Sequence, residues 1–252
     1  NLTMVEKLAD GVPNIILAGF VTPNIRLEAG KPYGIIFGSV FRRNANGDLW
    51  LNAAGMPVLS PTNAQIGNTN PDYLWGINNE LTWKGFNFSF LLDIRQGGDV
   101  FSRNLGDLRR AGVVKETAEF PRFNPDGSIN KPYIIEGVGP DGVTKNTVKL
   151  DAQQYWGSLF AFGVGETYVF DASWIRLREM SVSYKFPSSL FTKSVFGGAE
   201  LGIMGRNLFL RAYHFPHLDP ENNVLGVSNA QGFEFNGLPS TRNVGVFLKI
   251  NF

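Results

Sequence analysis

The chain has 252 residues, of which 13% are aromatic and only 18% are charged, and it contains no cysteine. Its 23 Lys and Arg nearly balance its 22 Asp and Glu, so the charge gives no indication of a nucleic-acid-binding surface. The lack of cysteine excludes a disulfide scaffold and a thiolate metal site. No run of 18 apolar residues is present, so no transmembrane helix is predicted. The mean hydropathy of -0.07 remains compatible with a membrane barrel, because barrel strands are apolar on one face only.

The first 74 residues carry weak structural signals. Residues 1–33 are broken by Pro and Gly and are assigned only loosely. Residues 34–41 are predicted as a strand that turns at residues 44–47 and pairs back through residues 49–51. Three prolines and many Asn and Gly predict a loop over residues 52–74.

Residues 75–84 and 86–95 carry the clearest strand pattern in the chain. Apolar residues recur at alternate positions, and a tight turn at Lys84-Gly85 separates the two runs. Ten residues at about 3.3 Å each, tilted by about 45°, span about 23 Å, close to the ~25 Å apolar band of a membrane barrel. Such an apolar face can contact either lipid or a second sheet in a soluble sandwich. Its members are Trp75, Ile77, Leu81, Trp83, Phe86, Phe88, Phe90, Leu92 and Ile94.

Residues 96–171 do not show this alternation of apolar and polar residues. Pro-Asp-Gly turns occur at residues 125–127 and 140–142, and the second is predicted to close a polar hairpin. Asp151 is expected to cap a short helix that runs to Trp156. A connection of this length between two strong strands is uncommon unless it is functional.

Three further strands are predicted at residues 173–186, 199–210 and 243–252. In the first of them the apolar parity flips near Arg178, and either a β-bulge or emergence of the strand above the lipid would explain the flip. The short connections at Lys84-Gly85 and at residues 187–198 then alternate with the long ones at 96–171 and 211–242. A membrane barrel has short turns on one rim and long loops on the other, so this alternation favours a barrel over a sandwich.

The chain ends on a strand with one apolar face and a terminal aromatic residue. An aromatic ring suits the interface between lipid and water at a barrel rim. The face comprises Val244, Val246, Leu248, Ile250 and Phe252.

Several short segments of the chain resemble, in the same order along the sequence, segments of the C-terminal barrel of SusC/RagA-family TonB-dependent transporters of the Bacteroidetes outer membrane. The resemblance covers residues 34–252, and residues 1–33 match only loosely. The segments are GNTNPD (67–72), WKGF (83–86), GGDVF (97–101), DASWIRLR (171–178) with Tyr184 and Pro187, GRNLF (205–209), LDPE (218–221) and PSTR (239–242).

The resemblance implies an all-β fold, in which this chain supplies antiparallel C-terminal strands of a larger barrel of 22 strands with long extracellular loops. It also implies import of glycan fragments or peptides, a SusD-like surface lipoprotein as a lid, and energy from TonB through an N-terminal region absent from this chain. Five strands are too few to close a barrel, so we expect the chain to be the C-terminal part of a longer protein. Two alternatives remain: a small self-contained outer-membrane pore or adhesin, and a soluble carbohydrate-binding β-sandwich.

In a barrel, one face of the sheet contacts outer-membrane lipid and the other faces the lumen. We expect Glu80, Asp93, Glu179 and Lys185 to face the lumen, and the C-terminus to lie on the periplasmic side. The barrel assembly machinery is expected to read the last strand, since it reads a terminal aromatic in the proteins that this sequence resembles. The residues expected to face lipid are Trp83, Phe86, Phe88, Phe90, Tyr184, Phe186 and Phe252.

Aromatic residues concentrate on the two long connections and are candidates for contact with the lid. Interfaces are enriched in such residues, although packing of the two loops on each other would also use them. The candidates are Trp156, Phe160, Phe162 and Tyr168 on the first connection, and Tyr213, Phe215, Phe233 and Phe235 on the second.

The sequence predicts no catalytic, cofactor or metal site. His214 and His217, the only histidines, lie in one loop without a convincing further ligand, and Pro216 prevents a regular helix there. Residues 124–128 lack the alternating carboxylates of a Ca²⁺ loop and are interpreted as a turn. With both histidines in one loop, no Ser–His–Asp arrangement is persuasive, and the chain is predicted not to be an enzyme.

Overall fold

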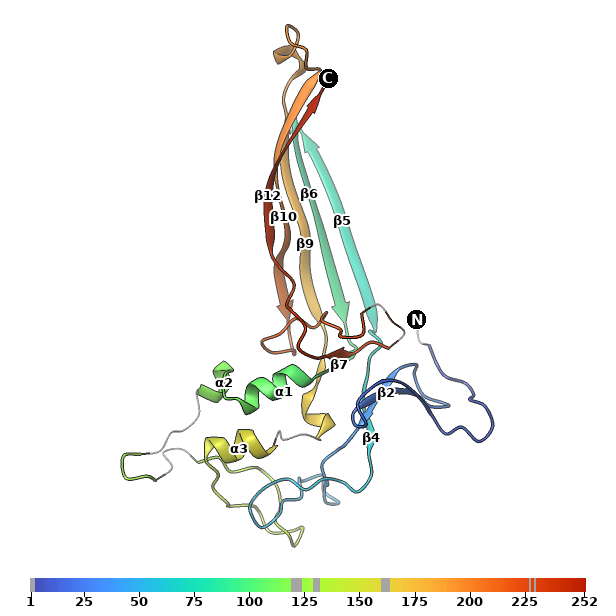
Figure 1. Ribbon diagram of the computed structural model, residues 1–252, viewed down its shortest axis with the longest axis vertical. Coiled ribbons are helices and arrows are strands. Elements are labelled where there is room, and N and C mark those ends of the chain that lie inside the picture. The colour runs from blue at the N-terminus through green and yellow to red at the C-terminus, as the bar shows by residue number, and fades with distance from the viewer. Residues whose placement is uncertain (1–2, 119–123, 129–131, 160–163, 227, 229) are drawn as a thin grey trace. The chain divides into compact units, whose positions relative to one another are not determined.

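A computed structural model describes residues 3–118, 124–128, 132–159, 164–226, 228 and 230–252 (Figure 1). The chain divides into two compact units. The loop unit comprises Asn1–Asn70, Gly98–Asp171 and Glu221–Gly237, and the strand unit comprises Pro71–Gly97, Ala172–Pro220 and Leu238–Phe252. Within the described residues, the helices are too short or too polar to cross a bilayer.

The strand unit is one antiparallel sheet of five strands in the order β12-β10-β9-β6-β5 (Figure 1). Each strand begins and ends within two residues of a strand predicted from the alternation of apolar side chains. The strands are β5 (Tyr73–Trp83), β6 (Phe86–Gln96), β9 (Trp174–Lys185), β10 (Gly198–Ala212) and β12 (Asn243–Asn251).

The register places the short connections at one end of this sheet. Trp83 pairs with Phe86 across a turn in which Lys84 and Gly85 both have positive φ, 47° and 88°. Two such residues are typical of the tight hairpin turn that matches strand twist. At the same end Gly198 pairs with Asn251, so the 187–198 connection and the end of β12 lie there as well. The predicted segregation of short and long connections is confirmed.

Of the two explanations for the parity flip in β9, the strand pairing shows the bulge. The partners of β6 pass directly from Glu179 to Leu177, which leaves Arg178 as the extra residue. On β10 the pairing skips in the same place, where Asn207 adopts a positive φ of 52°. The bulge restores the apolar parity upstream, because Leu177 and Ile175 now lie on the same face as Met180.

Gly202 provides a close contact between strands on the polar face of the sheet. A Cβ at Gly202 would overlap Cζ of Phe247, its cross-strand partner, and would lie 2.7 Å from Cβ of Ser183. The Phe247 ring therefore lies over the glycine, as aromatic rings do beside glycines in designed and natural sheets. Gly245 lies two residues before Phe247 and has space for a side chain. The atom nearest to a Cβ at this position would be Cγ of Met204, at 4.0 Å.

We therefore expect Gly202→Ala to lower the free energy of unfolding by about 1–3 kcal/mol, because the added methyl overpacks the contact. Gly245→Ala is the matched control and should be neutral or slightly stabilising. Guanidinium unfolding of the full-length protein in detergent measures both. Combining Gly202→Ala with Phe247→Leu should recover part of the loss, and equal effects of the two alanines would contradict the contact.

The loop unit contains two small sheets and several short helices. Its larger sheet has the order β1-β2-β3-β4, and the smaller has the order β11-β7-β8, in which β11 and β7 run parallel. The elements are β1 (Ile15–Gly19), β2 (Asn24–Leu27), β3 (Ile35–Gly38), β4 (Ala64–Asn68), β7 (Asp99–Ser102), α1 (Arg103–Arg110), α2 (Lys115–Ala118), α3 (Ala152–Leu159), η1 (Gly165–Tyr168), β8 (Val169–Asp171) and β11 (Phe233–Glu234).

Residues from both long connections and from the first 70 residues share the core of the loop unit. One cluster joins Ile25 and Ile36 to Phe101, Tyr168 and Phe233, all of which are buried. The prediction of a loop over residues 52–74 is wrong at β4 and at the start of β5. The β4 segment, AQIGN, has one large apolar residue, and its pairing with β3 defines it as a strand.

Two local predictions in the first long connection are confirmed. Backbone hydrogen bonds close a hairpin around residues 140–142, with Tyr133 and Leu150 paired in both directions. The Asp151 carboxylate accepts a hydrogen bond from the backbone N–H of Gln154 at 2.7 Å, and the Gln154 side chain accepts one from the N–H of Asp151 at 3.0 Å. This reciprocal cap begins α3, which continues beyond Trp156 to Leu159.

Candidate functional site

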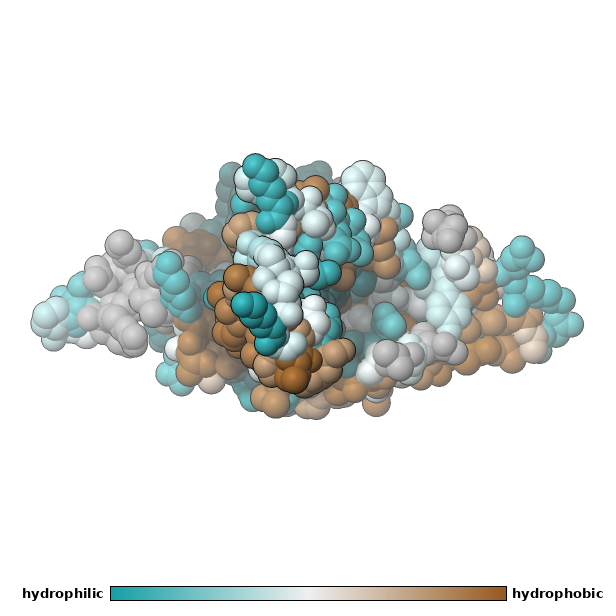
Figure 2. Space-filling model, turned by 90° about the horizontal axis from the view of Figure 1, so that it is seen from above, coloured by the Kyte–Doolittle hydropathy of each residue, from teal (hydrophilic) through white to brown (hydrophobic). Residues whose placement is uncertain are grey.

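The five-stranded sheet has one apolar face and one polar face. Register aligns Trp83 with Phe86, and Phe86 in turn with Tyr184. The same alignment continues through Leu201 to Leu248 at the far strand. The apolar face therefore crosses all five strands. Seen from the end with the short connections, hydrophobic residues gather on one side of the nearest strands and hydrophilic residues on the other (Figure 2).

Much of this apolar face is exposed in the strand unit. Trp83 is 67% exposed, and Val244 and Val246 on β12 are 69% and 71% exposed. Among the other predicted lipid-facing residues, Phe88 and Phe90 align with Val182 and Met180 on β9. Leu248 and Ile250 continue the apolar face on β12, and Phe186 is the residue after β9. Phe252 is 91% exposed, and its ring lies 5.5 Å from that of Phe196.

Glu80, Asp93, Glu179 and Lys185 all lie on the opposite face, as the alternation predicted. Polar side chains there are linked across strands. The Ser89 and Ser181 hydroxyls are 2.8 Å apart, and the Ser183 hydroxyl donates to Glu200 at 2.6 Å. Such a face suits water or a polar filling and not hydrocarbon.

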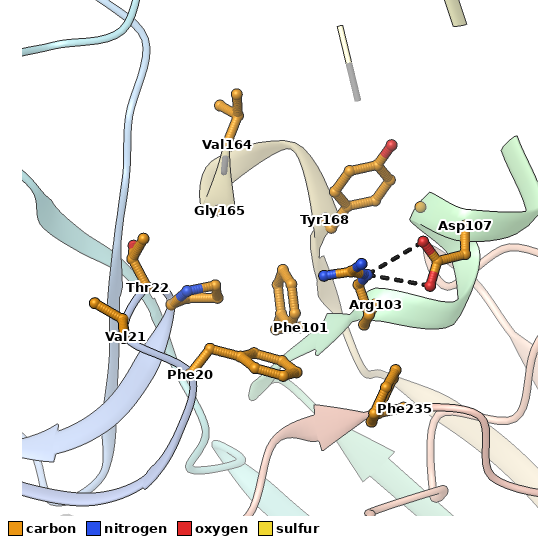
Figure 3. Close-up of a pocket in the computed structure, with 12 residues that line it drawn as sticks. Phe20, Val21, Thr22, Phe101, Arg103, Asp107, Val164, Gly165, Tyr168 and Phe235 are labelled. Atoms are coloured by element: carbon orange, nitrogen blue, oxygen red, sulfur yellow. Dashed lines mark hydrogen bonds and ion pairs between the residues drawn. The ribbon is translucent and has the colours of Figure 1, made fainter. Parts of the chain in front are cut away.

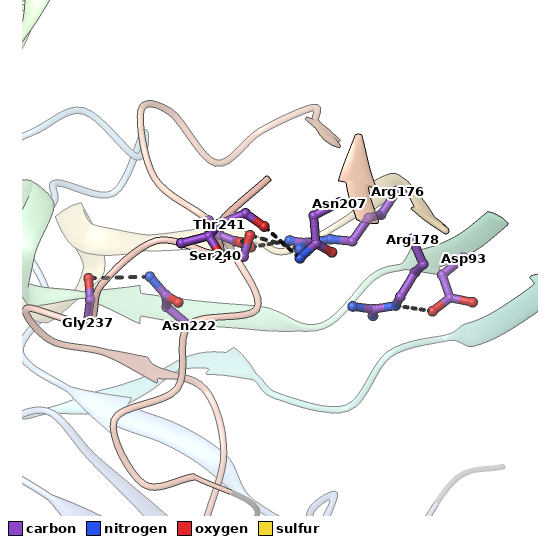
Figure 4. A network of polar contacts seen from close by, with 9 residues as sticks. Asp93, Arg176, Arg178, Asn207, Asn222, Gly237, Ser240 and Thr241 are labelled. Carbon is purple, nitrogen blue, oxygen red and sulfur yellow. Dashed lines mark hydrogen bonds and ion pairs between the residues drawn. The ribbon is translucent and has the colours of Figure 1, made fainter. Parts of the chain in front are cut away.

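A buried polar network lies in the strand unit at the end where the long connections leave the sheet (Figure 4). The Arg176 guanidinium, on β9, donates to the Asp219 carboxylate at 2.6 Å and to the Ser240 hydroxyl at 2.9 Å. Ser240 in turn donates to Asp219 at 2.5 Å. The side chains of Arg176 and Asp219 are only 2% and 5% exposed. The network thus joins both ends of the second long connection to β9.

Each member of this network comes from a different motif of the sequence analysis. Arg176 lies in DASWIRLR, Asp219 in LDPE and Ser240 in PSTR. A second junction joins two other motifs, because the Asp99 carboxylate accepts a hydrogen bond from the N–H of Asn68 at 2.8 Å. The motifs therefore mark the places where the connections are fixed.

The predicted lid-contact aromatics divide into buried and exposed residues. Trp156, Tyr168 and Phe233 are buried in the loop unit, and Phe215 is buried in the strand unit. Tyr213 is 47% exposed and Phe235 is 37% exposed. Phe160 and Phe162 lie outside the described residues. The two long connections do pack on each other in the loop unit, through β11 and β7, so part of the aromatic content has a structural role.

A cavity of about 560 Å³ lies within the loop unit (Figure 3). Sequence reasoning did not find it, because four separate segments form it. These are the β1–β2 turn, the β7–α1 segment, η1 with the residue before it, and the residue after β11. The lining residues are Phe20, Val21, Thr22, Pro23, Phe101, Arg103, Gly106, Asp107, Val164, Gly165, Tyr168 and Phe235.

Close packing around α1 and η1 shapes this cavity. Ser102 caps α1 by accepting a hydrogen bond from the N–H of Leu105, and it donates to the buried Glu234 carboxylate at 2.5 Å. This bond fixes the position of β11 and hence of Phe235. A Cβ at Gly106 would lie 3.0 Å from the Tyr168 ring, so glycine allows α1 to approach η1 closely.

The cavity wall is mainly apolar and carries one ion pair. The Phe20 ring lies 5.7 Å from that of Phe235 and 6.5 Å from that of Phe101. Nε of Arg103 donates to both oxygens of Asp107 at 3.1–3.2 Å. Burial raises the pKa of Tyr168 well above its ordinary value.

The described residues contain no group of three or more His, Asp or Glu side chains that could hold a metal ion. His217 adopts a positive φ of 66° in its loop.

Comparison with known proteins gives a consistent result. No family model matches the chain. Three curated relatives from Formosa agariphila are TonB-dependent receptors P3, P26 and P39, with 24%, 26% and 24% identity over 82%, 79% and 85% of this chain. Each match spans 19% of the relative, so the chain corresponds to about a fifth of these proteins.

Solved structures agree with these relatives. The RagAB peptide transporter matches 97% of this chain and 25% of its own chain, with a TM-score of 0.58 and 16% identity. The RagAB peptide importer in its closed-closed state matches 96% of this chain, with a TM-score of 0.60 and 17% identity. The chain resembles part of a SusC/RagA-type TonB-dependent receptor. The fold is similar to that of about a quarter of the RagAB chain, and the similar proteins are named as receptors and transporters.

Proposed function

We propose that the protein containing this chain imports nutrients across the outer membrane with energy from TonB. The observation that carries the proposal is the five-stranded sheet with one apolar and one polar face and all its short connections at one end. The similarity to TonB-dependent receptors over four fifths of the chain supports it. Glycan fragments and peptides are the two substrate classes that we consider.

In this proposal the sheet is part of the wall of a barrel of about 22 strands. Its apolar face contacts lipid, and the face with Glu80, Asp93 and Glu179 lines the lumen. The end with the short connections lies on the periplasmic side, and the two long connections extend outside the cell. Residues on the apolar face, such as Trp83 and Val246, are more than half exposed in the strand unit, as a lipid-facing surface requires.

A SusD-like surface lipoprotein is the proposed partner, as a lid over the import path. The similarity to the RagAB transporter supports a two-component assembly. Of the aromatic residues on the long connections, Tyr213 and Phe235 are the described ones with substantial exposed surface, so they are the proposed lid contacts.

Purification of the full-length protein in mild detergent should recover the lipoprotein in stable proportion. Tyr213→Ser should reduce that proportion several-fold, because exposed aromatic residues at an interface often dominate its affinity. Phe86→Ser is the control, since Phe86 has a similar exposed fraction, 49% against 47%, but lies at the end of the sheet with the short connections. Recovery of the transporter without any lipoprotein, or equal recovery with both variants, would contradict the lid contact.

Uptake measurements test the import itself. Cells that express the protein should accumulate its substrate only while TonB is present and the inner membrane is energised. Accumulation that is independent of TonB would support a passive pore instead.

A further inference from the structure

We infer that the cavity in the loop unit binds an apolar amino-acid side chain of a peptide ligand, and not a glycan. The inference rests on the proposed import function and chooses between its two substrate classes. It comes from the lining of the cavity, which the sequence did not predict.

The cavity has the size and access of a ligand site. Its volume of about 560 Å³ lies within the range of about 300–1,000 Å³ that is typical of small-molecule sites. Val21, on the β1–β2 turn, is 95% exposed, and Phe20 and Phe235 are 38% and 37% exposed. Phe101, by contrast, is only 4% exposed. A ligand can therefore enter past Val21 and contact a buried aromatic floor.

The chemistry of the walls favours an apolar group. Phe20, Val21, Phe101, Val164 and Phe235 offer no hydrogen-bond partners from their side chains. The lining side chains that can hydrogen-bond are Thr22, Tyr168 and the pair Arg103–Asp107, and the Thr22 hydroxyl already accepts a hydrogen bond from the N–H of Ser39. A sugar ring carries several hydroxyl groups, and each one that is buried without a partner opposes binding. An aromatic or branched aliphatic side chain has no such groups, and its burial against these rings is favourable.

The charged pair lies at one side of the cavity. Figure 3 shows the Arg103 guanidinium pointing from α1 toward the Phe101 ring, with Asp107 behind it. The pair brings a donor and an acceptor to the same wall, and a peptide main chain carries both an N–H and a C=O in every unit. A peptide can thus place its side chain on the aromatic floor while its main chain lies near Arg103 and Asp107.

Two exposed valines of the loop unit allow a matched experiment. Val21→Trp puts a large side chain at the entrance, and Val143→Trp makes the same change at a residue that is 79% exposed and does not line the cavity. Both side chains are exposed, so neither change disturbs the core. Phe20→Ala is a second variant, which removes an aromatic wall without blocking the entrance.

Isothermal titration calorimetry of the full-length protein, with the tripeptides Gly-Phe-Gly, Gly-Leu-Gly and Gly-Ser-Gly and with maltotriose, tests the inference. We expect the Phe and Leu peptides to bind and the Ser peptide and maltotriose to bind far more weakly. Val21→Trp and Phe20→Ala should each raise the Kd of Gly-Phe-Gly by about tenfold or more. Val143→Trp should leave it unchanged.

Several results would overturn the inference. These are the absence of binding by the Phe and Leu peptides, equal Kd values in wild type and Val21→Trp, and maltotriose binding that Val21→Trp abolishes. The proposed function fails separately. If lipoprotein recovery and TonB-dependent uptake persist while the peptides do not bind, only the cavity assignment is wrong. If the peptides bind but uptake does not depend on TonB, the import proposal is wrong and the cavity assignment stands.

Discussion

Arg176→Met is expected to destabilise the protein by about 3–5 kcal/mol, the largest effect that we predict for a single side chain. Arg176 and Asp219 are almost completely buried, and Ser240 donates to the same carboxylate. Removing the guanidinium takes a hydrogen-bonded counter-charge away from the buried Asp219 carboxylate. The loss of a buried partner costs far more than the pair itself contributes.

The pair Arg206–Glu179 provides the control for this substitution. It lies on the neighbouring strands β10 and β9 with an N–O distance of 3.6 Å, but its side chains are 58% and 43% exposed. Arg206→Met should cost less than about 1 kcal/mol, since exposed ion pairs contribute little.

Guanidinium unfolding of the full-length protein, followed by tryptophan fluorescence, measures both substitutions. The double substitution Arg176→Met with Asp219→Leu should recover most of the loss, because it removes both buried charges. Similar effects of Arg176→Met and Arg206→Met would show that the buried network does not fix the second long connection.

The second large effect is expected on the apolar face of the sheet. Ile77→Arg should lower the free energy of unfolding in a bilayer by about 2–4 kcal/mol, because a cation in the middle of a lipid-facing strand lies in hydrocarbon. Ile77 is near the centre of β5, is 44% exposed, and aligns with Leu92 on β6.

Asn78→Arg is the matched control, since Asn78 is the next residue of β5 and its side chain is on the opposite face. Its substitution should change the free energy of unfolding by less than about 1 kcal/mol. The measurement is reversible unfolding of the full-length protein in phospholipid vesicles. A penalty as large for Asn78→Arg as for Ile77→Arg would contradict the assignment of the two faces.

The long strands could be predicted from sequence because apolar residues alternate with polar ones along most of each strand. A shift of one residue in the pairing of a strand would move all its polar side chains to the apolar face of the sheet. The pattern therefore determines the register as well. The bulge at Arg178 was visible for the same reason, as a break in that pattern. The turn at Lys84-Gly85 and the cap at Asp151 each depend on neighbouring residues only.

The loop unit could not be predicted in this way. Strands such as β4 are short, and their pairing is decided by segments far away in the chain. Trp156, Tyr168 and Phe233 looked like contact residues in polar loops, but all three are buried. Tyr168 and Phe233 share a cluster with residues of the first 70, and Trp156 packs on Tyr133 and Tyr155 of the first connection. The cavity depends on four such segments. The only sequence signal for the buried network was the set of charged and hydroxyl residues in the motifs, at Arg176, Asp219 and Ser240.

We propose that this sheet lies in a membrane with its apolar face against lipid, and spin labels on the sheet test this directly. Since the chain has no cysteine, single cysteines can be placed at Ile77, Asn78, Gly245 and Val246 in a full-length protein without other cysteines, and labelled with a nitroxide. Power-saturation electron paramagnetic resonance in vesicles then compares collisions with oxygen and with a water-soluble nickel complex. Labels at Ile77 and Val246 should be reached mainly by oxygen, and those at Asn78 and Gly245 should not. If the nickel complex reaches the labels at Ile77 and Val246 as well as it reaches those at Asn78 and Gly245, the sheet does not have one face against lipid.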